Sequence, residues 1–342
     1  FALFCALTFV GVVRWTLLTL ASQGRLMFGA IAPLSIFMAA GLLQLAGRAA
    51  TVQNRNRTAV ALVAALALVA GVIPPLYLAP RYEPPPALRA ADLPADLRSV
   101  RARFGEGMEL LGYTADSQPR RPGEALRVTL YWRALAPMTE DHRVALHLLG
   151  RGAAEVGKID SWPGGGDLPT SFWQPGLIFA DPYLLPIDPA AETPTLLRLF
   201  VEVWRGSSAD HLPAFDLTGE PIPTLILAVG RAIAGPQMAA PLPALPLSTT
   251  FEYSIRLLGL TPGAEGAPSD GAITLFWETS GPIPADYTVF LHLTDADGKQ
   301  ITQADGPPLG GDWPTSAWLP GLPFADPRRF DLPASLPPGA YN

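Results

Sequence analysis

The stretch Val128-Thr129-Leu130-Tyr131-Trp132 returns 145 residues later as Ile273-Thr274-Leu275-Phe276-Trp277. Val128, Leu130 and Trp132 share one face of an extended chain, as expected of a β-strand with one buried side. The match continues at the same offset, because the segments 144–148, 167–176 and 179–182 return at 289–293, 312–321 and 324–327. A unit of this length is too long for a solenoid repeat. The sequence therefore predicts two copies of one folded domain.

Alternation of apolar and polar residues also predicts how each copy folds. It recurs at Val144, Leu146 and Leu148 and again over Leu197–Val203, with turn-forming Gly, Pro and Asp between the runs. About seven short strands fit between residues 108 and 229, the number typical of an immunoglobulin-like sandwich. We therefore predict two tandem immunoglobulin-like β-sandwiches, the first over residues 97–235 and the second, incomplete, over 251–342. Proline-rich linkers are expected at 80–96 and 236–250.

Composition restricts the classes of partner and cofactor. The net charge of the 342-residue chain is −6, its cationic residues are almost all Arg, and no basic run is present. Nucleic acid is therefore not an expected partner. Cys5 is the single cysteine, which rules out an intrachain disulfide and a CxxC metal site. No cofactor is expected.

The first 79 residues are far more apolar than the rest. Gly29–Leu45 and Val60–Leu78 lack formal charges and approach the roughly 20 residues that a membrane-spanning helix needs. Phe1–Val13 is expected to be the back half of a further, truncated helix. Gly47–Arg57 carries three Arg and no acidic residue, which places it in the cytoplasm by the positive-inside rule. These features predict a multi-pass protein of the cell membrane with membrane lipid as a partner and the β-domains extracytoplasmic.

The segment 20–33, Leu-Ala-Ser-Gln-Gly-Arg-Leu-Met-Phe-Gly-Ala-Ile-Ala-Pro, resembles a known family. It is similar to a segment near the carboxyl end of the membrane region in the family 39, or protein-mannosyltransferase-like, glycosyltransferases of the GT-C fold. Leu26 and Gly29 replace the aromatic residue and the proline of that pattern. The resemblance implies that Gln23 and Arg25 lie near the phosphate of a lipid-linked sugar. A role of Arg25 in anchoring the helix at the lipid headgroups is the alternative.

A loop rich in Trp and Asp occurs in both copies and offers candidate binding residues. Exposed tryptophan faces can stack on sugars, which makes Trp162, Trp173, Trp313 and Trp318 candidates for glycan binding. Oxygen-rich loops can hold calcium, so Asp160, Asp167 and Asp181 are candidate ligands. The alternative is structural, with Asp side chains capping turns and the indoles closing the end of the sandwich.

Histidine and serine patterns assign no catalytic residue. His147 and His292 occupy equivalent places on a predicted strand, but a lone His per strand lacks the partners of a zinc site. No Ser in a Gly-x-Ser-x-Gly setting occurs nearby.

The resulting prediction is the carboxyl-terminal part of a bacterial membrane glycosyltransferase. It would use a lipid-linked sugar donor, with the catalytic core missing from this sequence and the β-sandwiches as outer accessory domains. Lipid-linked sugar and an envelope glycan are the further partners that this function implies. The alternative is a non-enzymatic, membrane-anchored surface protein whose sandwiches bind glycans or proteins.

Overall fold

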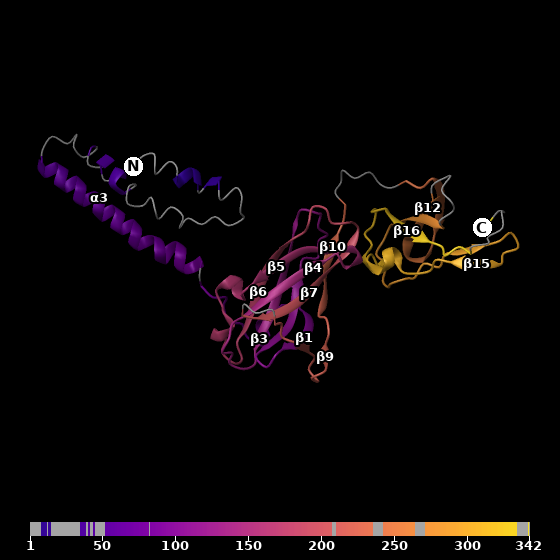
Figure 1. The fold of residues 1–342 in the computed structure, drawn as a ribbon, viewed down its shortest axis with the longest axis horizontal. Helices are drawn as coiled ribbons and strands as arrows, with labels where there is room; N and C mark the ends of the chain where they lie inside the picture. The colour runs from indigo at the N-terminus through magenta and orange to yellow at the C-terminus, as the bar shows by residue number, and fades with distance from the viewer. Residues whose placement is uncertain are drawn as a thin grey trace. The chain divides into compact units, whose positions relative to one another are not determined.

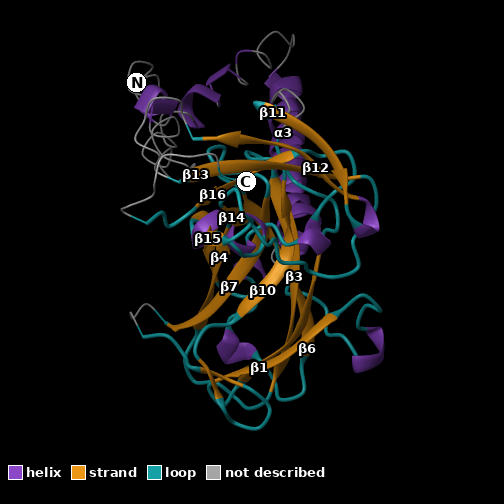
Figure 2. Ribbon diagram, turned by 90° about the vertical axis from the view of Figure 1, so that its right-hand side faces the viewer, coloured by secondary structure: helices purple, strands orange, loops and turns teal. Residues whose placement is uncertain are grey.

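The computed structural model describes residues 8–11, 13–14, 35–38, 40–41, 44, 52–81, 83–206, 210–234, 242–263, 271–333 and 341. The chain divides into two units, Phe1–Glu83 and Pro84–Asn342, and each is described by itself. The second unit consists mainly of strands joined by loops and short helical turns, as Figure 1 and Figure 2 show. The predicted β-rich character of this part of the chain is confirmed.

The predicted membrane-spanning α-helical segment is contradicted. Within the described ranges, no helix is long and apolar enough to cross a membrane. Helix α3 (Val52–Ile73) begins inside the Arg-rich loop and includes Arg55 and Arg57 in its first two turns. At Pro74 it gives way to the π-helical turn η2 (Pro74–Leu78) and then to η3 (Ala79–Arg81).

The other predicted membrane segments fall largely outside the described residues. Of Phe1–Val13 the structure describes residues 8–11 and 13, and of Gly29–Leu45 it describes residues 35–38, 40–41 and 44. All of these are helical.

The first repeat, residues 98–232, consists of two antiparallel sheets. One has the strand order β6-β3-β2-β1-β8-β9, and the other has the order β10-β7-β4-β5. With ten strands, β1 to β10, this repeat exceeds the predicted seven. Its strands are β1 (Arg98–Phe104), β2 (Met108–Ala115), β3 (Ala125–Ala134), β4 (His142–Leu149), β5 (Glu155–Ser161), β6 (Ile178–Pro186), β7 (Thr195–Arg205), β8 (Ala214–Phe215), β9 (Pro221–Ile222) and β10 (Ile226–Ala232).

Both sheets of the first repeat contribute to one core. Alternate residues of β3 face inward and are completely buried, as the sequence pattern predicts. Alternate residues of β4 and β7 cover them from the second sheet, so the hydrophobic effect holds the two sheets face to face. The central members of this core are Leu126, Val128, Leu130, Trp132, Val144, Leu146, Leu148, Leu197, Leu199, Val201 and Val203.

The second repeat, residues 245–329, reproduces part of this arrangement. Its larger sheet has the order β11-β12-β13-β16, and β14 pairs with β15 in a separate two-stranded sheet. The pairings β12–β13 and β13–β16 correspond to β2–β3 and β3–β6 of the first repeat. The strands are β11 (Leu245–Thr250), β12 (Ile255–Pro262), β13 (Ala272–Thr279), β14 (His292–Thr294), β15 (Gln300–Gln303) and β16 (Phe324–Arg329).

The similarity between the two repeats extends further toward the amino terminus than the segments that match at an offset of 145. Residues 104–114 match residues 251–261 at an offset of 147, because the first repeat has two more residues than the second between this segment and the matching stretch that begins at Val128 and Ile273. Glu109 lies opposite Arg133 in the first repeat, whereas Arg256 lies opposite Glu278 in the second. The same cross-strand ion pair is therefore present with its charges exchanged.

Candidate functional site

Four aromatic rings form a continuous cluster in the core of the first repeat. Phe104 meets Trp132 edge-on with 5.8 Å between ring centroids, and Trp132 lies 6.3 Å from Trp173. Trp173 in turn meets Phe179 edge-on at 4.8 Å. All four rings are buried, so the cluster is closed to solvent.

The second repeat has the same four rings at equivalent positions, but its cluster is open. The centroid distances are 6.1 Å for Phe251–Trp277, 6.0 Å for Trp277–Trp318 and 4.8 Å for Trp318–Phe324. Phe251 is 50% exposed, whereas its counterpart Phe104 is 1% exposed. The rings therefore border a space that the first repeat fills.

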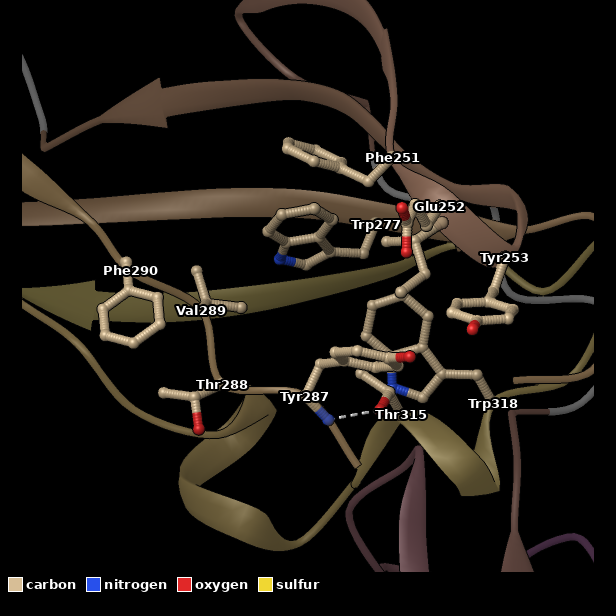
Figure 3. Close-up of a pocket in the computed structure, with 11 residues that line it drawn as sticks. Phe251, Glu252, Tyr253, Trp277, Tyr287, Thr288, Val289, Phe290, Thr315 and Trp318 are labelled. Carbon is tan, nitrogen blue, oxygen red and sulfur yellow. Dashed lines mark hydrogen bonds between the residues drawn. The ribbon is translucent and has the colours of Figure 1, made fainter. Parts of the chain in front are cut away.

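That space is a cavity of about 400 Å³, which we call the aromatic cavity (Figure 3). Its volume lies within the range typical of small-ligand pockets. Figure 3 shows rings from several segments of the second repeat gathered around it. The lining residues are mostly apolar or aromatic, namely Phe251, Glu252, Tyr253, Ile255, Trp277, Tyr287, Thr288, Val289, Phe290, Thr315 and Trp318.

Two tyrosines form one wall of the aromatic cavity. The rings of Tyr253 and Tyr287 lie 5.9 Å apart at an interplanar angle of 31°, and both are exposed. Partial desolvation, followed by the neighbouring Tyr253 and Glu252, raises the pKa of the Tyr287 hydroxyl above its ordinary value. Tyr287 is therefore neutral at physiological pH and presents a hydroxyl group, not a charge.

Tyr253 lies in a turn with a strained backbone. Tyr253 and the next residue, Ser254, have φ angles of 55° and 64°. Left-handed backbone costs about 1–2 kcal/mol for a residue with a side chain. Strained residues cluster at ligand sites. The equivalent turn of the first repeat has its positive φ at Gly105, where no side chain is strained.

A threonine anchors the segment that carries Tyr287. The backbone N–H of Tyr287 donates to Thr315 Oγ1 at 2.8 Å (Figure 3). The Thr315 hydroxyl donates to the Ala285 carbonyl at 2.8 Å. Thr170 makes the equivalent bonds with His142 and Glu140 in the first repeat. The Thr315 hydroxyl is thus occupied by the protein itself, and this side of the cavity offers a ligand few free polar groups.

The predicted glycan-binding tryptophans lie in the core or next to it. Trp173, Trp313 and Trp318 are buried, and Trp162 is half-buried. The Nε1 groups of Trp173 and Trp318 donate to the carbonyls of Leu168 and Trp313, each five residues earlier. Trp173 therefore has no free face for a sugar ring. Trp318 borders the aromatic cavity, but the exposed rings around that cavity are other residues.

The predicted calcium ligands have protein partners of their own. Asp160 forms an ion pair with Arg143 at 2.6 Å. Asp181 accepts hydrogen bonds from the backbone N–H of Gly164 at 2.9 Å and from the Tyr183 hydroxyl at 2.6 Å. Asp167 lies at the end of the short turn Gly164–Gly166. Among the residues described, no group of three His, Cys, Asp or Glu side chains could hold a metal ion.

Burial of Asp181 makes the stability of the first repeat depend on pH. Desolvation raises the pKa of Asp181 to about 6 from 3.8 and outweighs its hydrogen bonds with Tyr183 and Gly164. The folded repeat therefore holds this proton more tightly than the unfolded chain does. The contribution is fully present below pH 3.8 and is lost as the pH rises through 6.

Replacing Asp181 by Asn should remove this dependence. The stability of the wild type minus that of Asp181→Asn should fall by about 2.4 kcal/mol between pH 4 and pH 7. Urea unfolding of both proteins at several pH values measures this difference. The pH effects of all other groups are common to both proteins and cancel in the subtraction. A difference that stays constant over this range would contradict the expectation.

The remaining predicted site residues lie apart from the aromatic cavity or outside the described residues. Gln23 and Arg25, the predicted contacts of a lipid phosphate, fall on residues that are not described. His147 lies on the surface of the first repeat between Glu155 and Glu202. His292 is exposed and lies 3.5 Å from a carboxylate oxygen of Asp305.

The sequence prediction missed the residues that distinguish the aromatic cavity. Tyr253, Tyr287 and Phe290 occupy positions where the first repeat has Glu106, His142 and Ala145. The sequence feature that could have indicated the cavity is therefore the presence of these aromatic residues in the second copy only. The prediction rests instead on tryptophans in the loops of both copies. Neither a protein-family model nor a curated protein sequence matches this chain.

Proposed function

We propose that this chain is a non-catalytic binding protein whose second repeat takes a mainly apolar ligand into the aromatic cavity. The observation that carries this proposal is the cavity itself, which is lined by aromatic rings of which Phe251, Tyr253 and Tyr287 are exposed. Glu252 is the only carboxylic acid among the residues that line the cavity, and no nucleophile–base pair accompanies it. These lining residues can bind an apolar ligand, and they do not include the pair of groups that nucleophilic catalysis needs.

The exposed rings supply enough free energy for ligand recognition. A half-exposed aromatic ring that becomes buried removes on the order of 100 Å² from water, worth roughly 2 kcal/mol. Phe251, Tyr253 and Tyr287 together would give several kcal/mol, from which the entropy cost of association is subtracted. A small aromatic ligand should therefore bind with a dissociation constant of roughly 1 mM, equivalent to about 4 kcal/mol.

Nuclear magnetic resonance of the indole N–H groups tests the proposal in the full chain. We expect p-cresol to shift the resonances of Trp277 and Trp318, which border the aromatic cavity, in a saturable manner. The equivalent Trp132 and Trp173 should not shift, because their cluster is closed. Tyr253→Ala should raise the dissociation constant at least about threefold, given the ring area that p-cresol would lose.

The matched control for Tyr253→Ala is Phe172→Ala, which removes an aromatic ring that is 68% exposed in the first repeat. It should leave the affinity for p-cresol unchanged. Equal shifts at all four tryptophans, or no shift at any of them, would overturn the proposed function.

A sugar is the second candidate ligand, favoured by one observation. Tyr253 and Tyr287 present exposed rings together with hydroxyl groups, a combination on which pyranose rings can stack. The same resonances, recorded with methyl glycosides, test this candidate. Shifts at Trp277 and Trp318 at glycoside concentrations below those needed for p-cresol would favour a sugar.

The glycosyltransferase function that the resemblance of residues 20–33 implies stays a prediction about the whole protein. It is supported by the resemblance of that segment and by the order of apolar segments, proline-rich linker and β-rich part, and its two site residues, Gln23 and Arg25, lie outside the described residues. Cleavage of a sugar-lipid donor by the full-length protein would support it, and an unreactive full-length protein would count against it.

A further inference from the structure

A turn of the second repeat, residues 309–312, contacts the first repeat through hydrogen bonds. The Asp312 carbonyl accepts a bond from the backbone N–H of Leu196 at 2.7 Å. The Asp312 carboxylate accepts one from the backbone N–H of Gly152 at 2.6 Å and one from Arg198 Nη1 at 2.8 Å. All three oxygen atoms of Asp312 are therefore bonded to the first repeat.

Arg198 adds a second bond to the same turn. Its Nη2 donates to the carbonyl of Gly311 at 3.0 Å, so the planar guanidinium group spans two consecutive residues of the turn. The side chains of Arg198 and Asp312 are only 26% and 16% exposed. Charge-assisted bonds of a partly desolvated pair are stronger than those of a fully exposed ion pair. The pair therefore fixes how the turn lies on the first repeat.

Apolar contacts accompany these polar bonds. Leu196 and Ile233 of the first repeat pack against the hydrophobic core of the second, to which Leu309 of the turn belongs. Leu196 lies opposite Arg231 in the pairing of β7 with β10, and Arg231 Nη1 donates to the Ala317 carbonyl at 3.4 Å. We call the contributing residues of the first repeat the docking patch, namely Gly152, Leu196, Arg198, Arg231 and Ile233.

The first repeat has an equivalent turn, residues 164–167, which is built in the same way. In both turns the first three residues have positive φ angles. In both, the first N–H donates at 2.9 Å to a buried aspartate, Asp181 or Asp326. A side chain at Gly164 would place its Cβ 2.9 Å from Pro85 Cδ. The turn of each repeat therefore lies against a part of the chain that precedes that repeat.

We propose that this turn is a docking element, and that its partner in the second repeat is the docking patch of the same molecule. The two repeats then form one rigid unit. Independent motion is the default for two domains of one chain unless their interface restrains them. Here three donors of the first repeat converge on Asp312, and such complementarity fixes the register of an interface. The covalent connection between the repeats favours this contact over the same contact between two molecules.

Electron paramagnetic resonance of the full chain measures whether the repeats keep one mutual orientation. Cys5→Ser removes the only cysteine, and Lys158→Cys and Thr274→Cys provide positions for spin labels on β5 and β13. We expect a single narrow distribution of distances between the two labels. Asp312→Ala should widen this distribution at least about twofold, because the repeats regain the independent motion of linked domains.

Arg198→Ala tests the same contact from the first repeat and should also widen the distribution. Combining it with Asp312→Ala should widen the distribution no further than Asp312→Ala alone, since both substitutions break one contact. The matched control is Asp297→Ala, which removes an exposed carboxylate of the second repeat between β14 and β15. It should leave the distribution unchanged. Unchanged indole N–H resonances show that each variant remains folded.

Three results would overturn docking between the repeats. They are a wild-type distribution as wide as that of Asp312→Ala, a narrow distribution that survives in both alanine variants, and a distance that disappears when labelled protein is diluted with unlabelled protein. The last result would show that the turn docks on a second molecule. If Asp312→Ala alters the indole resonances, Arg198→Ala decides between these outcomes. Docking does not depend on the aromatic cavity, so a failure to bind p-cresol would leave it intact.

Discussion

Replacing Trp173 by alanine is expected to lower the free energy of unfolding of the first repeat by about 3–5 kcal/mol. Trp173 is 1% exposed, contacts Trp132 and Phe179 through its ring and donates its Nε1–H to the Leu168 carbonyl. The substitution removes this packing and leaves a cavity. It also leaves the Leu168 carbonyl without the indole N–H that donates to it. A loss of this size is comparable to much of the stability of an ordinary domain.

Urea unfolding followed by tryptophan fluorescence measures this loss. The matched control is Phe172→Ala, one residue earlier on the same turn but exposed, which should change the stability by less than about 0.5 kcal/mol. If the Trp173 variant is as stable as the wild type and instead loses affinity for a glycan, Trp173 is a binding residue and its assignment to the core is wrong.

Replacing Glu109 by arginine is expected to destabilise the first repeat by more than about 3 kcal/mol. Glu109 is 1% exposed and lies between two guanidinium groups. Arg101 Nε donates to its Oε1 at 2.7 Å, and Arg133 Nε donates to its Oε2 at 2.8 Å. A third cation in this buried position would leave three like charges without the carboxylate that compensates them.

The second repeat shows how the same site tolerates the opposite charges. There Arg256 pairs with Glu278 at 2.9 Å, and Ser248 occupies the position equivalent to Arg101. The triple variant Arg101→Ser, Glu109→Arg, Arg133→Glu reproduces that arrangement and should recover all but about 1–2 kcal/mol of the loss. Urea unfolding of the single and triple variants checks this. A triple variant no more stable than Glu109→Arg would show that the pair is not interchangeable between the repeats.

Local patterns predicted much of the first repeat. Alternation placed Leu126, Val128, Leu130 and Trp132 on one buried face, because strand side chains point to opposite sides of a sheet at a period of two. The shared offset correctly paired Trp173 with Trp318, and both make the same hydrogen bond to a carbonyl five residues earlier. Repetition could not tell whether these indoles bind a ligand or fill a core, since either role would be repeated.

The apolar content of Val60–Leu78 predicts one α-helix over this run, and that prediction is wrong. Pro74 cannot donate the backbone hydrogen bond that α-helical geometry requires, and the α-helix gives way there to a π-helical turn. The described α-helix begins earlier, at Val52, and includes charged residues that the predicted span left out.

The sequence by itself determined that segments of the β-rich part recur at one offset and that Leu126, Val128, Leu130 and Trp132 share one inward face, because these properties follow from self-similarity and local periodicity. Only the tertiary structure decided that the aromatic cluster is closed around Phe104 and open around Phe251. Phe104 lies opposite Ala214 of β8 and packs in the same core. Ala214 is distant from it in sequence, so no local pattern records the contact.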